Sequence, residues 1–529
     1  MGNYYVAEMK DINISSFNFP GFIQYDFFYV DKTEYVWKLV RRGAGAYFLS
    51  RPRRFGKSLL LSTLKALFQG KRELFRGLAI DKMDYDWKEY PVIHLDFGTC
   101  VAENKEEMAA YLLHELDRTA RDYGIPSREG DYVMQFENLI WDLSKLYPTG
   151  KVVILVDEYD KPILSNITNE KVSEILRVLK GFYGVIKKCD AQIRFAFITG
   201  VSKFTRVSLF SDLNNLKDLT LNPDYAGMLG FTEEEIRKHY ADEIPNAAKK
   251  NGCSEEELMQ RLLKWYDGYR FSEAETHVCN PVSLNMFFDN HYKFSNYWDE
   301  TGTPRFLLEL ARDRYYDYEE ELGKFHYENI FSAYDFDHLD ITGLLWQTGY
   351  LTIKEVTTAP RGEDRYLLDF PDFEVADSFN LRILEYYAKL GKGNGGPLLD
   401  DMQNAICEGN LEGFMKLFQS VLAGIKYEMH LPYEKYYQTI FFVVFRLLGL
   451  CIEAESHTNE GSIDAYIRTA RKIYIFEFKV NKDTETAIGQ ILDRRYYEKF
   501  CNEGLPIVLV GANFDSSKGR IDSWGETTA

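Results

Sequence analysis

The sequence predicts an α/β protein: a parallel sheet with flanking helices, a helical connector, and a second, smaller α/β domain. Three observations support this fold class. Short apolar runs alternate with helical stretches in the first half of the chain, a pattern typical of a parallel sheet covered on both faces. A Gly-rich segment at 389–397 follows a region of mixed signals. After it, the order helix, two strands, helix, strand indicates a compact unit of its own.

The chain of 529 residues is too long for a single core. We expect an N-terminal domain over 1–300 with a helical lid, a mostly helical connector over 301–400, and a C-terminal domain over 401–529. Hydrophobic residues make up 45% and charged residues 27%, which excludes a disordered chain. Neither a signal peptide nor a membrane-spanning run is predicted, and the scattered cysteines indicate no disulfide framework. A cytoplasmic protein without a membrane partner is expected.

The predicted elements of the first half follow one another in strand–helix order. The strands are expected at 46–50, 91–97, 152–156 and 194–199, and the helices at 58–69, 106–122 and 172–187. Residues 231–297 are predicted to be mostly helical, with a helix start at Thr232. An aromatic turn, WYDGYRF at 265–271, is predicted around Gly268 and is interpreted mainly as a packing element, with base stacking as the alternative.

Positive charge gathers near one predicted strand–helix junction. The chain carries a net charge of −18, yet residues 31–75 hold eleven Lys and Arg against three acids, a local charge of +8. This asymmetry indicates an anion-binding surface. The tripeptide Gly56-Lys57-Ser58 lies there, between an apolar strand and a helix, where backbone N–H groups favour phosphate.

The tripeptide predicts a phosphate-binding loop in which Lys57 reaches the terminal phosphates and Ser58 holds Mg²⁺. The loop departs from the general motif, because Arg51 stands where a glycine is usual. We expect Arg51, Arg53 and Arg54 to offset this by charge. The alternative is an incidental Gly-Lys-Ser at a helix start.

Acidic residues end the strand at 152–156. Asp157 is predicted to hold Mg²⁺ and Glu158 to orient an attacking water, since adjacent buried acids need a charged partner. The alternative is a strand that only exits into solvent. Thr199, at the end of the next strand, is expected to sense the γ-phosphate, and Arg206 to contact nucleotide or a neighbouring subunit.

Four stretches of the chain resemble the bacterial and archaeal AAA-ATPase-like family. They are YVDKT at 29–33, FLSRPRRFGKS at 48–58, VDEYD at 156–160 and SLFSDLNNL at 208–216. The resemblance covers about residues 10–290 and implies an ATP-binding P-loop domain of the P-loop NTPase fold. It also implies that Phe55 and the Arg-Pro-Arg-Arg loop belong to the nucleotide site.

A second group of polar residues is predicted in the C-terminal unit. In a strand at 462–468, Asp464 shares a face with Tyr466 and Arg468, and in a strand at 472–480 Glu477 shares a face with Lys479. Antiparallel pairing would place Asp464 beside Glu477 and Lys479. Two close carboxylates repel each other unless they share a cation, for which Mg²⁺ or Mn²⁺ is suited.

This pattern resembles the PD-(D/E)xK nuclease superfamily, whose core is a small α/β restriction-endonuclease-like domain. The match extends to Glu434 on the preceding helix and Gln490 on the following one, and covers about 405–520. The resemblance implies catalytic roles for Asp464, Glu477, Lys479, Glu434 and Gln490. Related proteins often carry Gly-Arg before the motif aspartate, whereas this chain has Gly461-Ser462. A surface Glu/Lys pair and an inactive nuclease fold are the alternatives.

The expected function is an ATPase coupled to metal-dependent phosphodiester cleavage of nucleic acid, DNA before RNA. The rival is an ATP-dependent switch or scaffold whose C-terminal domain binds nucleic acid or protein without cutting. Assembly into a homo-oligomer is left open, and the weak excess of basic charge does not assure strong binding to nucleic acid.

Overall fold

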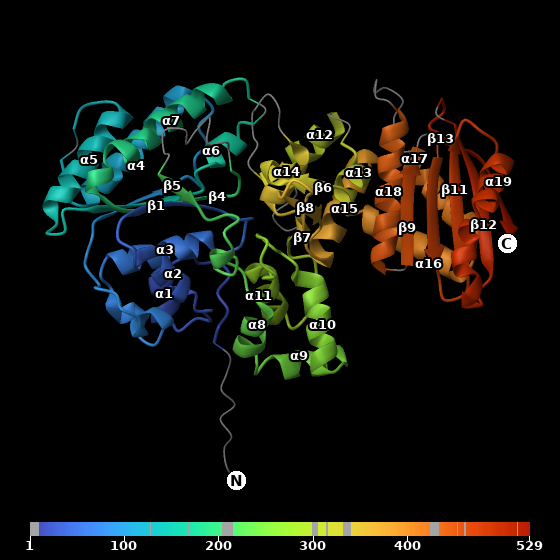
Figure 1. The fold of residues 1–529 in the computed structure, drawn as a ribbon, viewed down its shortest axis with the longest axis horizontal. Helices are drawn as coiled ribbons and strands as arrows, with labels where there is room; N and C mark the ends of the chain where they lie inside the picture. The colour runs from blue at the N-terminus through green and yellow to red at the C-terminus, as the bar shows by residue number, and fades with distance from the viewer. Residues whose placement is uncertain are drawn as a thin grey trace, which may run out of the picture. The chain divides into compact units, whose positions relative to one another are not determined.

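The computed structural model describes residues 10–126, 128–167, 169–203, 215–298, 305–313, 316–331, 340–423, 433–451, 453–459, 462–515 and 517–529. The chain forms two compact units (Figure 1). Unit 1 comprises residues 1–297 and 325–372, and unit 2 comprises 298–324 and 373–529. Within the described ranges, no helix combines the length and the apolar character needed to cross a bilayer.

A five-stranded parallel sheet lies at the centre of unit 1, in the order β2-β3-β4-β1-β5. Its strands are β1 (Gly45–Ser50), β2 (Val92–Asp96), β3 (Val152–Asp157), β4 (Ile193–Gly200) and β5 (Leu216–Asp218). Strand β3 is buried along its whole length, as expected for an apolar strand covered on both faces. The first four strands confirm the predicted ones, and β5 was not predicted.

Helices cover both faces of this sheet. Figure 1 shows α4 (Lys105–Asp122), α5 (Tyr132–Leu146), α6 (Lys161–Leu164) and α7 (Val172–Lys188) on one side, with α1 (Phe19–Gln24), α2 (Thr33–Val40) and α3 (Lys57–Phe68) on the other. Helices α4 and α5 begin at side-chain caps, since Asn104 and Asp131 each accept a backbone N–H of the first turn. The parallel α/β class and its P-loop NTPase arrangement are therefore present.

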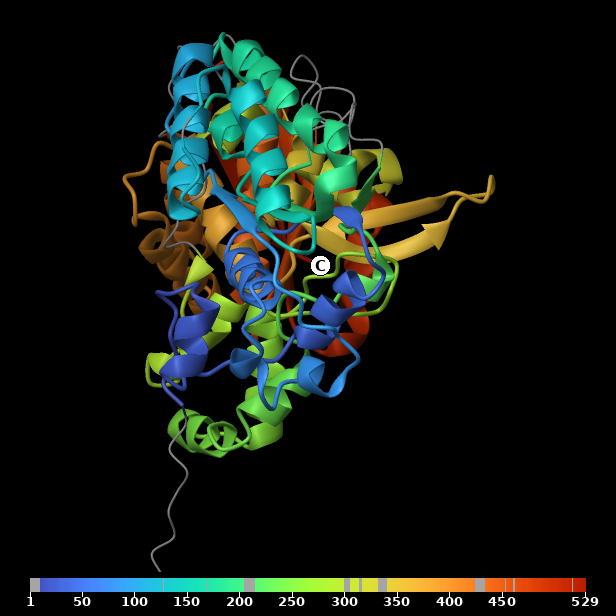
Figure 2. The same cartoon turned by 90° about the vertical axis from the view of Figure 1, so that its left-hand side faces the viewer.

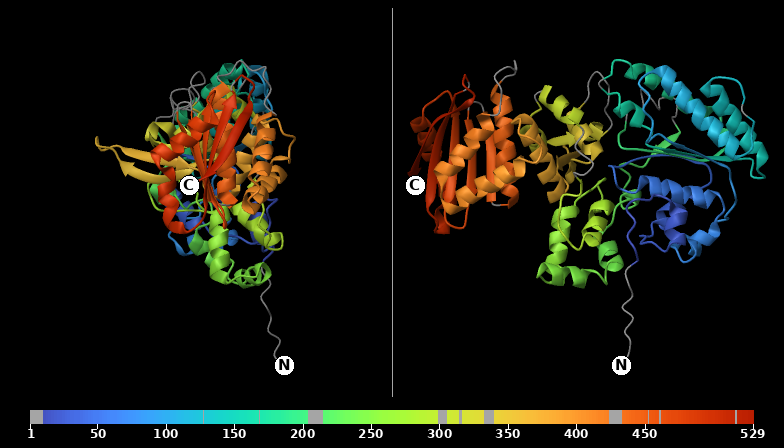
Figure 3. Two further views of the ribbon diagram at one scale, coloured as in Figure 1. Left: turned by 90° about the vertical axis from the view of Figure 1, so that its right-hand side faces the viewer. Right: turned by 180° about the vertical axis from the view of Figure 1, so that it is seen from behind.

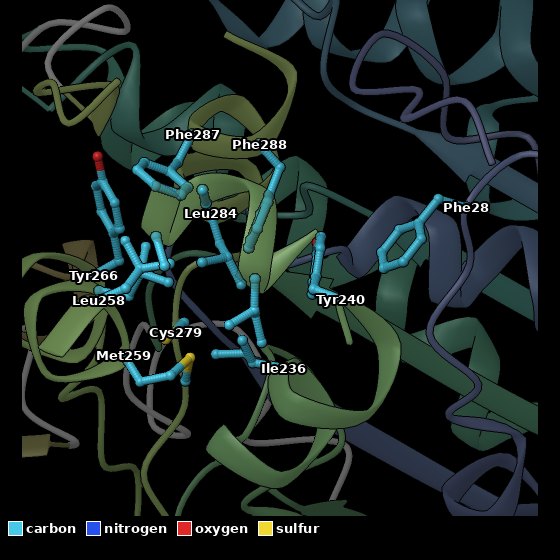
Figure 4. Close-up of a cluster of buried hydrophobic side chains, with 14 of the residues drawn as sticks. Phe28, Ile236, Tyr240, Leu258, Met259, Tyr266, Cys279, Leu284, Phe287 and Phe288 are labelled. Atoms are coloured by element: carbon cyan, nitrogen blue, oxygen red, sulfur yellow. The ribbon is translucent and has the colours of Figure 1, made fainter. Parts of the chain in front are cut away.

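A helical lid follows the sheet. It consists of α8 (Glu233–His239), α9 (Ile244–Asn251), α10 (Glu255–Tyr266) and α11 (Pro281–Asp289). The predicted start at Thr232 is confirmed, because Thr232 and Glu235 form a capping box. Side chains of α8, α10 and α11 converge on one apolar cluster, and Phe28 from the N-terminal segment packs against Tyr240 (Figure 4).

A small antiparallel sheet completes unit 1, with the order β6-β8-β7. It is formed by β6 (Phe325–Tyr327), β7 (Thr352–Thr358) and β8 (Asp364–Asp369), next to α14 (Ile341–Thr348). Figure 2 shows β7 and β8 as an extended hairpin. Residues 301–400, expected as one mostly helical connector, are thus shared between the two units and contain a β-sheet.

Unit 2 is built on a five-stranded sheet in the order β13-β12-β11-β10-β9. The strands are β9 (Glu453–Asn459), β10 (Ser462–Arg468), β11 (Ile473–Val480), β12 (Ile507–Asp515) and β13 (Arg520–Thr528). The helices are α12 (Arg305–Asp313), α13 (Tyr318–Gly323), α15 (Phe373–Tyr387), α16 (Gly395–Glu408), α17 (Leu411–Ala423), α18 (Tyr433–Cys451) and α19 (Thr484–Arg494). The predicted linker at 389–397 lies inside this unit and comprises part of the turn after α15 and the first residues of α16.

The two faces of the unit 2 sheet are covered by different helices (Figure 3). The rings of Phe418 and Phe441, from α17 and α18, lie 5.8 and 4.4 Å from the ring of Phe478 on β11. On the other face, Ile491 of α19 packs with Ile473 and Ile475. Because side chains alternate along a strand, Glu477 and Lys479 belong to the face covered by α19.

Candidate functional site

The loop between β1 and α3 has the backbone of an anion-binding turn. Arg54 and Gly56 both adopt left-handed conformations, with φ of 67° and 90°. Gly56 is the N-cap of α3, which begins at Lys57. The first N–H groups of a helix have no acceptor within it, so those of this turn are suited to bind phosphate oxygens. A left-handed turn at the helix start adds to such a concave array of N–H groups.

Lys57 is the first residue of α3 and is 7% exposed. Its Nζ donates to the backbone carbonyls of Arg51 and Pro52, at 2.9 and 2.8 Å. Burial lowers the pKa of Lys57, while the nearby carboxylates of Asp157 and Glu158 act in the opposite direction. The lysine therefore sits in a low-dielectric site, facing acids, with its ammonium held on loop carbonyls that a phosphate group can replace.

The two acids lie at the carboxyl end of β3, beside the ends of the neighbouring parallel strands. Strand β4 lies between β1 and β3, so the carboxyl ends of all three meet at the edge where α3 begins. Asp157 is 3% exposed, and its Oδ1 accepts from the hydroxyl of Thr199 at 2.7 Å. The structure thus brings Lys57, Asp157 and Thr199 together, with the Thr199 hydroxyl hydrogen-bonded to the Asp157 carboxylate.

Glu158 follows Asp157 in a left-handed conformation, with φ of 49°. Its side chain is half-buried, and desolvation raises the pKa of its carboxyl, opposed by the charge of Lys57. The positive charge of the exposed Arg53 guanidinium lowers the pKa of both Lys57 and Glu158. A carboxyl with a raised pKa next to a phosphate site is suited to accept a hydrogen bond or a proton from water.

Asp160 adds a buried acid that the sequence analysis did not assign. Its Oδ2 accepts from the N–H groups of Val201 and Ser202, at 3.0 and 2.6 Å, and from the Ser202 hydroxyl at 2.5 Å. These bonds tie the end of β4 to the turn that carries Glu158. Arg206 and most of the 208–216 stretch lie outside the described residues.

Arg51 occupies the position at which the usual phosphate-loop motif has a glycine, and its side chain has structural contacts there. Its side chain is 1% exposed and donates to the carbonyls of Ser50 and Thr220, at 2.9 and 2.8 Å. Burial lowers its pKa to about 9, and the charge of Asp218 opposes this. These contacts direct the guanidinium into the protein, where it ties β1 to the segment after β5. Arg54 donates to the carbonyl of Tyr297 at 3.0 Å, so Arg53 is the loop arginine that is exposed.

An apolar pocket adjoins the loop and the first turns of α3. It is lined by the N-terminal segment (Phe28 to Val30), by Phe55 and Leu59, by Leu229 before the lid, and by Val282 of α11. Lys32 also lines it, and its Nζ contacts both carboxylate oxygens of Glu235 at 2.6 Å. No pattern in the sequence indicated this pocket, because its walls come from segments far apart in the chain, at 28–59 and at 229–282.

The donor set near the loop fits a hard cation. Ser58 lies in the first turn of α3, half-buried, and Asp157 offers a buried carboxylate; both present oxygen, which Mg²⁺ prefers. Among the residues whose side chains the structure describes, no three His, Cys, Asp or Glu gather as a metal-binding group. One or two protein oxygens together with phosphate are the usual ligands of Mg²⁺ at nucleotide sites.

The second candidate site lies on the unit 2 sheet. Strands β10 and β11 pair antiparallel, and the register places Asp464 directly opposite Glu477. The predicted pairing of the two strands is therefore confirmed. Glu477 is fully buried, and its Oε1 lies 2.7 Å from Nζ of Lys479, which is 5% exposed. Burying such a pair removes the hydration of both charges, so the pair is weak evidence for a stabilising role.

Two further predicted residues lie on helices α19 and α18 of unit 2. Gln490 lies on α19, half-buried and one residue before Ile491, which packs on the Glu477 face. Helix α19 approaches β12 closely, since a Cβ built on Gly511 would lie 2.6 Å from the carbonyl of Thr484. Glu434 belongs to α18, and its side chain, like that of Asp464, lies outside the described part of the chain.

A cation and two rings lie on the same face of the sheet. Nζ of Lys499 lies 4.3 Å from the ring centre of Tyr466 and 4.7 Å from that of Phe500. Tyr466 packs with Ile473 and Ile475, on the face that carries Glu477. A lysine held over aromatic rings at this face is suited to contact a phosphate backbone or a base.

Comparisons with known proteins match two family models, one to the part of the chain that holds each candidate site. The family model described as "Predicted AAA-ATPase" matches residues 12–210, and that described as "PD-(D/E)XK nuclease superfamily" matches residues 432–524. An uncharacterized protein in the vnfD 5′ region of Azotobacter chroococcum mcd 1 is 35% identical over 511 residues, which cover 94% of each chain. The structure of the Aeropyrum pernix ORC2 protein (ADPNP-ADP complexes) is 13% identical in sequence to this chain, with a TM-score of 0.20. The match covers 66% of this chain and 93% of that one.

Proposed function

Because the chain belongs to the predicted AAA-ATPase family and ends in a PD-(D/E)XK nuclease superfamily domain, we propose that it binds and hydrolyses Mg-ATP in unit 1 and cleaves nucleic acid in unit 2. One observation carries the first half of the proposal. Buried Lys57 lies at the start of α3 opposite Asp157 and Glu158, at the common edge of three parallel strands. This is the arrangement that phosphoryl transfer needs.

The residues of the first site have separate tasks in this proposal. The loop N–H groups and Lys57 bind the phosphates, and Lys57 exchanges the carbonyls of Arg51 and Pro52 for phosphate oxygens. Ser58 and Asp157 would hold Mg²⁺, with Thr199 keeping the Asp157 carboxylate in place. A cation held there would supply positive charge to offset that developing on the phosphates. Glu158 orients the attacking water, and Arg53 adds positive charge at the open side.

The apolar pocket would hold the nucleoside. It adjoins Phe55 and Gly56 of the loop, so a ligand with its phosphates on the loop can place an aromatic base between Phe28, Leu229 and Val282. Apolar walls with few polar groups are typical of sites for such ligands. The lid contributes to this pocket, which gives a route by which nucleotide binding influences the lid.

For unit 2, the carrying observation is the fully buried Glu477 next to Lys479, with Asp464 opposite in the strand register. Asp464 and Glu477 would hold Mg²⁺ or Mn²⁺, whose hard oxygen preference fits carboxylates. A bound cation would supply activation of a water and stabilisation of charge on the scissile phosphate. Lys479 orients that water, and Glu434 and Gln490 support the site. DNA is the first substrate class to test, and RNA the second.

A second candidate function is a nucleotide-dependent switch that binds nucleic acid or protein without cutting. One observation favours it: Ser462 stands where related proteins often carry arginine, so one phosphate contact is missing. The overall charge of −18 also opposes strong binding to nucleic acid. The intact set Asp464, Glu477 and Lys479 favours the nuclease.

Cleavage assays with the full chain separate the two functions. Single-stranded DNA, double-stranded DNA and RNA are incubated with Mg²⁺ or Mn²⁺, with and without ATP. Lys57→Ala and Glu477→Ala are run beside matched controls, Lys65→Ala on the same helix and Glu498→Ala at an exposed site. Cutting that Glu477→Ala abolishes and Lys57→Ala changes supports an ATP-coupled nuclease. ATP turnover without cutting under any condition favours the switch, and absence of ATP turnover contradicts the first half of the proposal.

A further inference from the structure

The aromatic turn at 265–271 packs directly against the phosphate loop. The guanidinium carbon of Arg51 lies 4.2 Å from the ring centre of Phe271. The ring of Phe55 meets those of Tyr269 and Phe271 edge-on, at 4.8 and 5.5 Å. All four side chains are buried. Arg51 and Phe55, at the two ends of the loop, therefore both contact the Phe271 ring, and Phe55 also contacts that of Tyr269.

The turn is anchored on its other side to the antiparallel sheet of unit 1. Tyr269 donates its hydroxyl to the carbonyl of Gly349 at 3.0 Å, and the N–H of Arg270 donates to the Thr352 hydroxyl at 2.7 Å. Gly268 has a φ of 137° and approaches Pro371 so closely that a Cβ would lie 2.0 Å from its carbonyl oxygen. These contacts leave the rings little freedom to move independently of the sheet.

The turn supplies one of the contacts that stabilise the buried guanidinium of Arg51. A buried guanidinium requires partners, and it finds carbonyls on β1 and after β5, with the Phe271 ring over its face. The carbonyl of Arg51 itself accepts from Lys57. A displacement of Arg51 would thus move the backbone on which the phosphate-binding lysine rests.

We propose that the turn Tyr269–Phe271 positions the phosphate loop, with Arg51 as the positioning residue that transmits the contact. In this arrangement the arginine replaces the flexibility of a loop glycine with a rigid attachment to the turn. Phosphate affinity then depends on the turn and on the antiparallel sheet behind it, and by linkage nucleotide binding stabilises that sheet. The inference rests on the proposed ATP site, since it assigns the loop a phosphate ligand.

Phe271→Leu tests the proposal, because leucine keeps apolar volume but removes the ring over Arg51. We expect the Kd for Mg-ADP, measured by calorimetry on the full chain, to rise about fivefold. The KM for ATP should rise likewise while kcat changes little, since the loop holds phosphate throughout the reaction. Phe271→Tyr keeps an aromatic ring over Arg51, so its Kd for Mg-ADP and KM for ATP should equal those of the wild type. Arg51→Lys, which keeps the charge but loses the planar stack, should also weaken binding.

Phe294→Leu is the matched control. The guanidinium carbon of Arg261, on α10, lies 4.4 Å from the ring centre of Phe294, so the two residues form a pair of the same kind. An unchanged Kd in Phe271→Leu, an equal rise in Phe294→Leu, or failure of Phe271→Tyr to restore binding would each overturn the inference. Hydrogen exchange of the backbone amides of residues 53–56, without nucleotide, is a second readout and should be faster in Phe271→Leu. Absence of ADP binding by the wild-type chain would refute the ATP site, whereas unchanged exchange would refute the positioning role.

Discussion

At the scale of single residues, the Glu477–Lys479 pair shows how much a buried charge demands of its surroundings. Neither group has access to water as a substitute partner, and they lie 2.7 Å apart. We expect Glu477→Ala to reduce the free energy of unfolding of unit 2 by about 3 kcal/mol, because it leaves the lysine buried without its carboxylate. Thermal unfolding and hydrogen exchange along β11 measure this loss.

The double variant Glu477→Gln/Lys479→Met is the control for that prediction. It removes both charges and should recover most of the stability of the wild-type chain, while cleavage stays abolished. A single Glu477→Ala variant as stable as the wild type would show that the pair is not buried in solution. Stability and activity are thereby separated at one position.

Glu158 carries a prediction about pH. Burial raises the pKa of its carboxyl, and a residue that accepts a proton from water works only when ionised. The turnover number for ATP should therefore fall with decreasing pH, with a midpoint above the value of about 4.3 for an exposed glutamate. Glu158→Gln should lower this number by about a hundredfold or more and leave ADP affinity nearly unchanged.

The measurement for Glu158 is the pH profile of ATP turnover at saturating ATP, beside ADP calorimetry on Glu158→Gln. Turnover by Glu158→Gln equal to that of the wild type would contradict its role as the water-orienting group. Loss of ADP binding in the same variant would instead indicate a structural role for the turn at Glu158, whose φ is 49°.

The residues near Lys57 could be predicted from the chain because one rule relates them. Carboxyl ends of parallel strands meet at one edge, so a helix start after β1 and acids after β3 had to be neighbours. The partner of Arg51 could not be predicted in this way. Phe271 lies 220 residues further on, in the lid segment, and no periodicity or spacing connects a loop arginine to a distant ring.

At the scale of elements, apolar content decided which strands were predictable. Strands β3 and β11 are buried along nearly their whole length and stand out as apolar runs. Edge strand β13 is mostly exposed, with the sequence RIDSWGETT, and β5 has only three residues. Such strands are held by hydrogen bonds to a neighbour rather than by burial, so their sequences carry little signal.

Gly268 gives the test at this scale. An alanine there would adopt an unfavourable φ and place its Cβ 2.0 Å from the carbonyl oxygen of Pro371. We expect Gly268→Ala to destabilise unit 1 by about 3 kcal/mol. Gly252→Ala is the control, because Gly252 has a φ of 66° with open space around it, and should cost only about 1 kcal/mol. Thermal unfolding of the two variants gives the comparison, and equal losses would show that the Pro371 contact is unimportant.

At the scale of the whole molecule, the chain crosses between its units three times, after residues 297, 324 and 372. The segment 325–372 returns to unit 1, which is why one expected connector is divided between the two. Composition does not reveal such an excursion, because each part is an ordinary helix or hairpin locally. The consequence is that the ATP site and the nuclease-like site belong to units joined by several chain segments rather than by one linker.

Coupling between the two sites within one chain is the last prediction. Lys57→Ala lacks a working ATP site and Glu477→Ala lacks a working nuclease site, but each keeps the other site intact. If ATP acts on the nuclease of its own chain, an equimolar mixture of the two variants should show no ATP-dependent cleavage. A mixture of wild-type chain with Glu477→Ala should cut in proportion to the wild-type chain present. Recovery of ATP-dependent cutting in the first mixture would contradict control within one chain, and would instead require that nucleotide bound by one copy acts on the nuclease site of another.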